Sequence, residues 1–398
     1  MKEIDLESAR ARRNNSAIDI ANEVDQLICE GVFPAGQSLP SERELAQRFS
    51  SSRGVIRTVL QIIETRGLLV REPNHRPVVN VSARLSSTSP RNLCVRLWPS
   101  SKHYVSSSIL HGIQSSDIAK QSQLVISGDP AEDWDTVIAA EADFLESVAD
   151  DPSTLGIIIW YLGGDRNTAS IQRVLDRNKP IVFIDRLPPK GLDVDFVGTN
   201  NLDSSRCAVQ YLLSLNHRRV AMISNIDPAS SVDDRERGYR RALQDHGIAV
   251  REEWIQRAMY DEEESVRTAL EQMFSSNDSP TAIFCINDNL ALQVHAILQS
   301  LGAQIPDEIS VIGFDGLLRW VPGGGHITTM NQEFEEFGRI AANLIQQRVE
   351  ERESKTVRHT LFNASLRPGP STGPAPTVSF RIRHQSSDPV HVPVIGDL

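Results

Sequence analysis

The sequence predicts an α/β protein in which a small helical N-terminal domain with a β-hairpin precedes a larger body of doubly wound parallel sheet. Three observations lead to this prediction. The chain has 398 residues, more than one ordinary hydrophobic core, so two or three domains are expected. Residues 15–81 show apolar residues at helical spacing followed by two short apolar runs. Beyond residue 91, short β-branched runs alternate with amphipathic stretches, which is typical of parallel strands covered by helices.

Three helices are expected in the N-terminal domain. The first covers roughly residues 17–30 and buries Ile20, Val24, Leu27 and Ile28. The second is short and opens at Ser41, which can form a capping box with Glu44. Ser50-Ser51-Ser52 interrupts it, and a third helix follows with five apolar residues on its core side, namely Val55, Ile56, Val59, Leu60 and Ile63.

Arg53 and Arg57 lie four residues apart in the third helix, so they share one face, away from the core. Two short helices with a tight turn, the second exposing paired arginines, are how a helix-turn-helix reads a major groove. On spacing alone, a solvated basic face on an ordinary helical hairpin stays open as the alternative. The apolar runs 68–70 and 77–81 then predict a hairpin with His75 and Arg76 at its tip, placed where a wing would contact DNA.

These residues resemble the winged-helix domain of GntR-type transcription regulators. The resemblance covers residues 15–81 and rests on Leu-Pro-Ser-Glu-Arg-Glu-Leu-Ala at 39–46, on the Ser-Arg and Ile-Arg pairs of the third helix and on the Gly-Leu-Leu that enters the wing. It implies that Arg43, Arg53 and Arg57 contact bases or phosphates. Ser52 and Gly54 beside them, and His75 and Arg76 in the wing, complete the predicted DNA-binding set, although the wing tip departs from the family's Gly-Arg-Gly turn.

Composition limits the classes of protein that need considering. The chain has a hydrophobic share of 40%, no apolar run of membrane-spanning length, and an N-terminus that does not read as a signal peptide. Its four scattered cysteines favour a reducing cytoplasm over a disulfide framework or a zinc site. The net charge of −11 belongs entirely to residues 81–398, whereas residues 41–80 hold 7 Arg against 4 Glu. An acidic body would suppress indiscriminate binding to nucleic acid and leave DNA affinity to a small basic face.

Residues 82–91 have linker composition, and the body follows. Its predicted strands are the apolar runs at 93–97, 124–127, 156–160, 181–184, 220–224, 282–286 and 310–314, and its predicted helices cover 107–119, 171–177, 204–215, 234–246, 263–274 and 290–301. In doubly wound sheets, ligands bind in crevices at the carboxyl ends of the strands.

Residues 92–372 resemble the effector-binding core of LacI/GalR-type repressors. The resemblance rests on segments in family order, among them those at 180–186, 216–221, 235–239, 282–292 and 301–315. It implies a periplasmic-binding-protein-like fold of two α/β subdomains, with ligand in the cleft and chain crossings that we expect near residues 195, 325 and 352. A GntR-type head on such a body resembles the chimeric class of the arabinose-operon repressor.

Arg235, Asn287 and Asp315 match the effector-contacting Arg, Asn and Asp of that family. The alternatives are a surface ion pair of Arg235 with Asp233 or Asp234, a turn role for Asn287 beside a capping Asp288, and a turn or capping role for Asp315. Polyols need bidentate hydrogen bonds and often an aromatic surface. Strand ends and the last loop therefore add further candidate ligand residues: His103, Tyr104, Trp160, Tyr161, Asp185, Arg186 and Trp320.

Two features depart from the family. Gly369 stands where an arginine is usual, and residues 373–398 form a Pro-rich tail for which we expect disorder or edge pairing.

The sequence thus predicts a cytoplasmic, homodimeric transcription regulator, a repressor whose operator binding is controlled by a small polar metabolite, in first place a sugar. An activator, or a sensor of a purine or sugar phosphate, is the alternative. We expect no cofactor, no metal, no membrane contact and no enzymatic activity. An aminotransferase fused to the same head would need a Schiff-base lysine, and Lys102, Lys120, Lys179, Lys190 and Lys355 lack that context. The missing signal peptide and the N-terminal domain also argue against a free-standing solute-binding protein.

Overall fold

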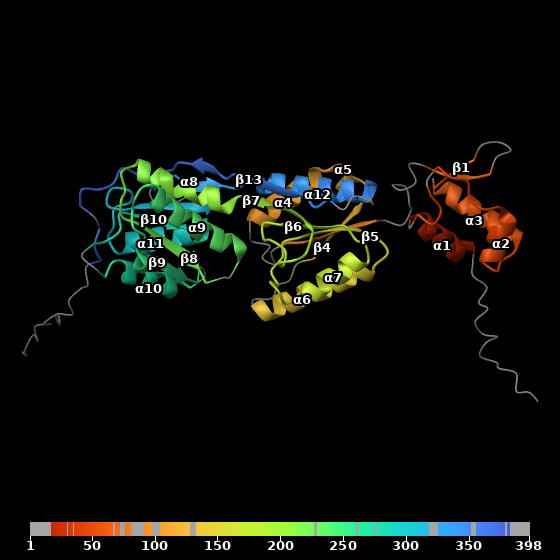
Figure 1. Ribbon diagram of the computed structural model, residues 1–398, viewed down its shortest axis with the longest axis horizontal. Coiled ribbons are helices and arrows are strands. Elements are labelled where there is room, and N and C mark those ends of the chain that lie inside the picture. The colour runs from red at the N-terminus through yellow and green to blue at the C-terminus, as the bar shows by residue number, and fades with distance from the viewer. Residues whose placement is uncertain are drawn as a thin grey trace, which may run out of the picture. The chain divides into compact units, whose positions relative to one another are not determined.

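The computed structural model describes residues 17–29, 31–34, 36–66, 68–71, 76–80, 91–97, 104–127, 133–226, 229–259, 262–275, 278–317, 325–351, 356–378 and 380–382. The chain divides into two compact units at residues 92–93. We call the N-terminal unit the head and the C-terminal unit the body, and Figure 1 labels the helices and strands of both. The predicted fold class, a winged helix-turn-helix followed by a two-subdomain α/β body, is confirmed.

The head consists of helices α1 (Ala17–Cys29), α2 (Glu42–Arg48) and α3 (Arg53–Thr65) and a hairpin of β1 (Leu69–Val70) with β2 (Val78–Val79). The capping box predicted at Ser41 is present, because the Ser41 hydroxyl accepts from the Glu44 amide while the Glu44 carboxylate accepts from the Ser41 amide. The core side of α3 is the predicted one, with Ile56, Val59, Leu60 and Ile63 buried.

The N-terminal subdomain of the body is built on a six-stranded sheet in the order β13-β7-β6-β5-β3-β4. These strands are β3 (Asn92–Arg96), β4 (Gln123–Ser127), β5 (Thr154–Ile159), β6 (Ile181–Ile184), β7 (Asp195–Thr199) and β13 (His359–Phe362). Its helices are α4 (Tyr104–Ser115), α5 (Asp117–Lys120), α12 (Phe334–Glu350), α6 (Trp134–Asp150) and α7 (Thr168–Asp176). Figure 1 shows α4, α5 and α12 on one face of the sheet and α6 and α7 on the other.

The C-terminal subdomain repeats this plan with the strand order β14-β12-β11-β10-β8-β9. The strands are β8 (Val220–Asn225), β9 (Ile255–Ala258), β10 (Ala282–Cys285), β11 (Ser310–Asp315), β12 (Thr328–Asn331) and β14 (Ser365–Arg367), of which β14 alone runs antiparallel to its neighbour. The helices are α8 (Asn201–Ser214), α9 (Ser230–Asp245), the single turn η2 (Glu252–Trp254), α10 (Glu263–Met273) and α11 (Asp288–Ser300). Their apolar faces form one continuous core with the sheet.

A glycine brings two helices into close contact in each subdomain. A Cβ on Gly112 of α4 would lie 1.8 Å from the Glu335 carbonyl oxygen of α12, and one on Gly238 of α9 would lie 2.0 Å from the Ser205 hydroxyl oxygen of α8. Any side chain at either position would push the helices apart. The Arg235-x-x-Gly238 pattern therefore combines a close helix contact with an arginine less than one turn away.

The chain crosses between the two sheets at residues 199–201, 331–334 and 362–365. Each crossing lies later in the chain than the expected positions near 195, 325 and 352. Five of the body's described strands were not predicted, and three of them explain the difference: β7 and β12 continue to the first two crossings, and β13 precedes the third.

The segment after residue 370 also differs from the sequence prediction. Residues up to Ile382 pack on the C-terminal subdomain, where Phe380 is buried against Phe274 at 5.6 Å between ring centroids. The buried His217 ring anchors the same segment, with Nε2 3.0 Å from the Gly373 carbonyl oxygen and Nδ1 3.0 Å from the Thr281 hydroxyl. Burial lowers the pKa of His217, so the ring is neutral at pH 7 and its Nε2 carries the donated hydrogen. The tail prediction is therefore wrong for residues 373–378 and 380–382, and residues 379 and 383–398 lie outside the described part.

Gly369, the departure from the family pattern, has a steric reason. A Cβ at this position would lie 2.1 Å from the His326 carbonyl oxygen. The Gly369 amide and carbonyl also both bond to the Thr328 hydroxyl, at 2.9 Å each. This backbone path leaves no space for an arginine side chain.

Phe380→Ala is expected to destabilise the body by about 2–4 kcal/mol, toward the lower part of the range for core Phe→Ala changes, because the segment can detach locally. Urea denaturation of the body measures the loss. Val378, two residues away and 76% exposed, supplies the matched control, and Val378→Ala should leave the midpoint unchanged. Equal midpoints for Phe380→Ala and Val378→Ala would contradict the anchoring role.

Candidate functional site

Arg43, Arg53, Arg57 and Arg76, the four arginines predicted to contact DNA, are all exposed in the head. Arg53 begins α3, Arg57 lies one turn later, Arg43 is on α2, and Arg76 precedes β2. Two of these cations lie near the start of α2: the pKa of Glu44 is lowered chiefly by hydrogen bonds from Ser41, and further by Arg76 and Arg43. Arg57 is 68% exposed, and its Nε donates to Glu42 at 3.0 Å.

Ser52 and Gly54 have different structural roles beside these arginines. The Ser52 hydroxyl caps α3 by accepting from the Val55 amide at 3.2 Å. Gly54 is exposed, and a Cβ there would approach nothing closer than 3.8 Å, so packing within the head does not require a glycine. A glycine in an exposed helix costs about 1 kcal/mol, which favours close approach of an outside molecule as its reason. His75 lies outside the described residues.

A pocket opens in the body at the carboxyl ends of strands from both sheets, with a volume of about 770 Å³ including its open mouth. Of the ten sequence-predicted ligand residues, the structure brings six together here: Trp160, Asp185, Arg186, Arg235, Asn287 and Asp315. Polar residues that the sequence argument missed also line it, namely Asn225, Ser231, Asn289 and Gln332, and Phe334 adds an aromatic ring.

Arg235 is the central cation of this pocket. Its side chain is 8% exposed and lies over the Phe314 ring, 3.9 Å from the centroid. Nε donates to Asn201 at 2.8 Å, and Nη1 donates to the Ile286 carbonyl at 2.5 Å and to Asp315 at 3.4 Å. These bonds fix the guanidinium and leave Nη2 as a donor for a ligand. The surface ion pair considered for Arg235 is therefore excluded.

Asp315 and Asp185 occupy unusual backbone conformations. Their φ angles are +117° and +64°, values that cost a non-glycine residue about 1–3 kcal/mol and that cluster at functional sites. Gln332 donates to Asp315 Oδ1 at 2.8 Å. Asp185 Oδ1 is buried and has no hydrogen-bond partner among the described residues. The pocket thus contains a hydrogen-bond acceptor that the protein itself leaves open.

The helix-capping role considered for Asp288 belongs to Asn287 in the structure. Asn287 caps α11, because its Oδ1 accepts from the Leu290 amide at 2.8 Å. Asp288 is instead buried behind the pocket, where it accepts from the Thr329 hydroxyl and from the Leu317 amide, at 2.7 Å each. Asn287 still lines the pocket, so capping limits only one of its two amide atoms.

Four of the predicted ligand residues are not placed in the pocket. Tyr161 is 2% exposed and packs edge-on to Phe183, and its hydroxyl donates to the Gly164 carbonyl. The physical reason is the alternation of extended chain, which directs Trp160 and Tyr161 to opposite sides. Tyr104 begins α4, but its side chain is outside the described set, as are His103 and Trp320.

Burial raises and the positive charge of Arg235 lowers the pKa of three nearby aspartates, Asp315, Asp288 and Asp185. Burial raises the pKa of Asp315 to about 7, with further increases from Asp288 and Asp185, while Arg235 and Gln332 lower it. Burial likewise raises the pKa of Asp288 to about 6 and raises that of Asp185. Near neutral pH the pocket therefore exchanges protons as well as offering acceptors.

The raised pKa of Asp315 predicts how the stability of the body depends on pH. The raised pKa of Asp315 means that the folded protein holds a proton which the unfolded chain releases near pH 4. That contribution to stability is complete at acidic pH and is lost as the pH rises through about 7. Between pH 5 and pH 8, the free energy of unfolding of the wild-type body should therefore fall by at least about 1.4 kcal/mol more than that of the Asp315→Asn variant. Urea denaturation at both pH values measures this, and parallel pH dependences would contradict it.

The structure contains no helix that could span a membrane and no group of three or more potential metal ligands among the residues it describes.

Comparison with known proteins identifies both parts of the chain. Residues 17–79 match the model of the gntR family of bacterial regulatory proteins, and residues 209–372 match that of the periplasmic binding protein-like domain. HTH-type transcriptional repressor PurR of Vibrio vulnificus is 29% identical over 188 residues, which are 47% of this chain and 56% of that protein. "Probable HTH-type transcriptional repressor ExuR" of Bacillus subtilis is 27% identical over 232 residues, 56% of this chain and 67% of that protein. The chain thus spans about half to two thirds of the curated relatives it matches.

Among solved structures, a LacI family regulator from Enterococcus faecium with bound ribose matches with a TM-score of 0.58 at 21% identity, covering 71% of this chain and 99% of that one. At this identity the likeness shows the fold alone. The predicted combination of a GntR-type head with a periplasmic-binding-protein-like body is confirmed.

Proposed function

We propose that this chain, which joins a GntR-type winged helix to a periplasmic-binding-protein-like body, is a sequence-specific DNA-binding transcription regulator. In this proposal it represses transcription, and a small polar metabolite in the body's pocket controls its binding to an operator. Its relatives PurR and ExuR are repressors by name and not enzymes, which supports the assignment.

The single observation that carries the proposed ligand binding is the arrangement of Arg235, Asp315 and Asp185 in the pocket. It offers a fixed donor in Arg235 Nη2 and acceptors in Asp315 and Asp185, one of which has no partner of its own. Hydroxyl groups satisfy both kinds at once, since each donates and accepts. Trp160 and Phe334 add aromatic surface to the same pocket. A neutral sugar suits this chemistry, and the ribose held by the E. faecium regulator agrees with it.

The exposed arginines of the head support the proposed binding to DNA. Exposed Arg53 and Arg57 on α3, with Gly54 between them, form a surface that can enter a major groove. One winged helix covers only a half-site, so we infer a homodimer on a near-palindromic operator in the cytoplasm, with most dimer contacts in the body.

The test has two stages. Selection of duplexes from a random library by the full-length protein should enrich a near-palindromic sequence, and a thermal-shift screen of sugars, sugar phosphates and purines should identify the ligand. At 100 times its Kd, a ligand stabilises the fold by about 2.7 kcal/mol. That ligand should weaken binding to the selected duplex. Failure to enrich any sequence would overturn the DNA half, and a ligand that stabilises the body without altering DNA affinity would overturn the regulatory half. If the screen identifies a purine or a sugar phosphate, that compound replaces a sugar as the proposed ligand. If the ligand tightens DNA binding, it acts as a co-repressor and not as an inducer.

A further inference from the structure

Arg235 and Asp315 of the pocket are both hydrogen-bonded to segments in which the chain crosses between the two sheets. The first crossing supplies Asn201, whose Oδ1 accepts from Arg235 Nε at 2.8 Å. The second crossing supplies Gln332, whose Nε2 donates to Asp315 Oδ1 at 2.8 Å. The groups proposed to hold the ligand are therefore fixed by the segments that join the two subdomains.

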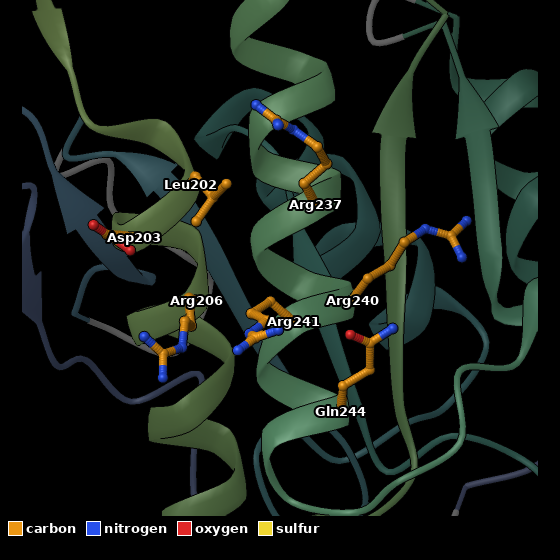
Figure 2. Close-up of a pocket in the computed structure, with 7 residues that line it drawn as sticks. All are labelled: Leu202, Asp203, Arg206, Arg237, Arg240, Arg241 and Gln244. Atoms are coloured by element: carbon orange, nitrogen blue, oxygen red, sulfur yellow. The ribbon is translucent and has the colours of Figure 1, made fainter.

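The packing of α8 on α9 explains why Asn201 and Arg235 meet. Asn201 begins α8, and Arg235 lies in the second turn of α9. Figure 2 shows α8 and α9 side by side at the surface concavity that they form, with Leu202 and Arg237 toward the same end of the two helices. Because the helices are aligned in this way, the Asn201 side chain reaches the Arg235 guanidinium.

Gln332 connects the two crossings to each other. Its Oε1 accepts from the Thr199 hydroxyl, while its Nε2 donates to Asp315. Thr199 and Gln332 are 4% and 5% exposed, so both side chains are shielded from solvent. An ionised carboxylate only accepts hydrogen bonds, whereas a hydroxyl can donate one. The Thr199 hydroxyl therefore satisfies the amide oxygen in the orientation that presents the amide nitrogen to Asp315.

Thr199 does not line the pocket, so it acts on a ligand through Gln332 and Asp315. Without the Thr199 hydroxyl, the buried Gln332 Oε1 would lose its donor, which would loosen the amide. We propose that Thr199 is a positioning residue for ligand binding: its hydroxyl holds the Gln332 amide on Asp315 and thereby links the pocket to the first crossing. The proposal rests on the function proposed above, because it concerns the response of the same pocket.

The titration of Asp315 reports on this link without any ligand. The charged groups that act on it most strongly are Arg235 on α9, Asp288 on α11 and Asp185 after β6. Burial raises the pKa of Asp315 to about 7, and the hydrogen bond from Gln332 lowers it. A loosened amide should raise the pKa of Asp315 further, because the ionised form loses a donor. Complete loss of a hydrogen bond to a charged group corresponds to about one to two pH units.

The experiment measures the free energy of unfolding of the body, within the full-length protein, between pH 5 and pH 10. Each variant is measured with and without Asp315→Asn, so the difference within each pair isolates the titration of Asp315 and yields its pKa in the folded state. That pKa should rise by about one to two units in Gln332→Met and by about half a unit or more in Thr199→Val. Thr199→Ser keeps the hydroxyl and should restore the wild-type pKa.

Thr281→Val is the matched control. Thr281 is also 4% exposed, and its hydroxyl is hydrogen-bonded to the buried His217, but it precedes β10 at the end of the strand away from the pocket. Thr281→Val should therefore destabilise the body without moving the pKa of Asp315.

A second measurement uses the sugar, sugar phosphate or purine that the thermal-shift screen selects. Thr199→Val should bind this compound about 3-fold to 10-fold more weakly, and Thr199→Ser should bind it like the wild type. Calorimetry on the full-length protein gives these affinities.

Equal pKa values of Asp315 in the wild type and in Thr199→Val, or an equal shift in Thr199→Ser, would overturn the proposal. A shifted pKa with undiminished binding of the selected compound would also overturn it, because Thr199 would then support the structure alone. A screen that selects no compound counts against the function proposed above, whereas the pKa values test the link between Thr199 and Asp315 in either case.

Discussion

The double variant Arg53→Ala, Arg57→Ala is expected to lose specific binding to the selected operator while keeping the fold of the head. Each arginine contributes about 1–3 kcal/mol if it bonds to a base edge, so the pair corresponds to a loss of about 30-fold to 10⁴-fold if the two effects add. Both side chains are exposed, whereas Ile56, Val59 and Ile63 form the buried side of α3, so the core is untouched. Fluorescence anisotropy with the selected duplex measures the loss, and circular dichroism confirms the fold.

The two arginines should differ when they are replaced singly. Arg57 Nε donates to Glu42 at 3.0 Å, so Arg57 must give up or share that bond when it contacts DNA. Arg53 has no such intramolecular competitor among the described residues of the head, and Arg53→Ala should therefore cost more. Glu42→Gln should tighten DNA binding, because it weakens the competing ion pair and removes a negative charge from the DNA-facing surface.

Salt dependence separates base contacts from phosphate contacts. A variant that loses a phosphate contact should show a salt slope lower by about one and should bind all sequences more weakly. Arg339→Ala, on α12 of the body and paired there with Glu336, is the control and should bind DNA like the wild type. Undiminished operator binding by the Arg53/Arg57 double variant would refute the role assigned to α3.

Local patterns made the head predictable from its sequence. The capping box needs only Ser41 and Glu44 at the correct spacing, and the buried side of α3 follows from apolar residues three and four apart. The same holds for the strand-end residues Asp185 and Asp315, because a buried β-branched run marks where each strand ends. These features depend on residues close together in the chain.

The sequence argument failed where distant segments decide the structure. The two residues after β5 show this, since Trp160 lines the pocket while Tyr161 packs on Phe183 in the core. The side of the sheet on which each of these two side chains lies depends on the register of β5 with its neighbours. Gln332 was missed because β12 is short and carries threonines in place of a run of large aliphatic residues. Asn225 directly follows the predicted strand at 220–224 and could have been found by the rule that identified Asp185.

The tail was mispredicted for a related reason. Its Pro-rich composition indicates disorder, but Phe380 fills a site beside Phe274 that only the folded subdomain creates. The buried His217, more than 150 residues earlier in the chain, holds the same segment through the Gly373 carbonyl. Neither partner can be recognised from the composition of the tail.

The response to ligand should depend on Asp315. This carboxylate accepts from Gln332 at 2.8 Å and from Arg235 at 3.4 Å, so Asp315 joins the crossing at residues 331–334 to the fixed guanidinium. Replacing it by alanine removes a charge-assisted acceptor, a change of about 1.5–3 kcal/mol, and should weaken binding of the ligand found in the screen by about 10-fold to 150-fold. Asp315→Asn keeps the side-chain shape and should weaken binding less.

Asp315→Ala should leave DNA affinity without ligand unchanged, because Asp315 belongs to the body and not to the DNA-facing surface of the head. The ligand's effect on DNA binding should nevertheless disappear at concentrations that saturate the wild type. Coupling between two binding equilibria is reciprocal, so a ligand that no longer binds can no longer weaken the operator complex. Tyr161→Phe provides the control: the sequence favoured Tyr161 for the pocket, whereas the structure buries it against Phe183, so this variant should respond like the wild type. Titration of the operator complex with ligand, for the wild type and both variants, measures these effects. A full response from Asp315→Ala would show that the ligand binds elsewhere, whatever the head does with DNA.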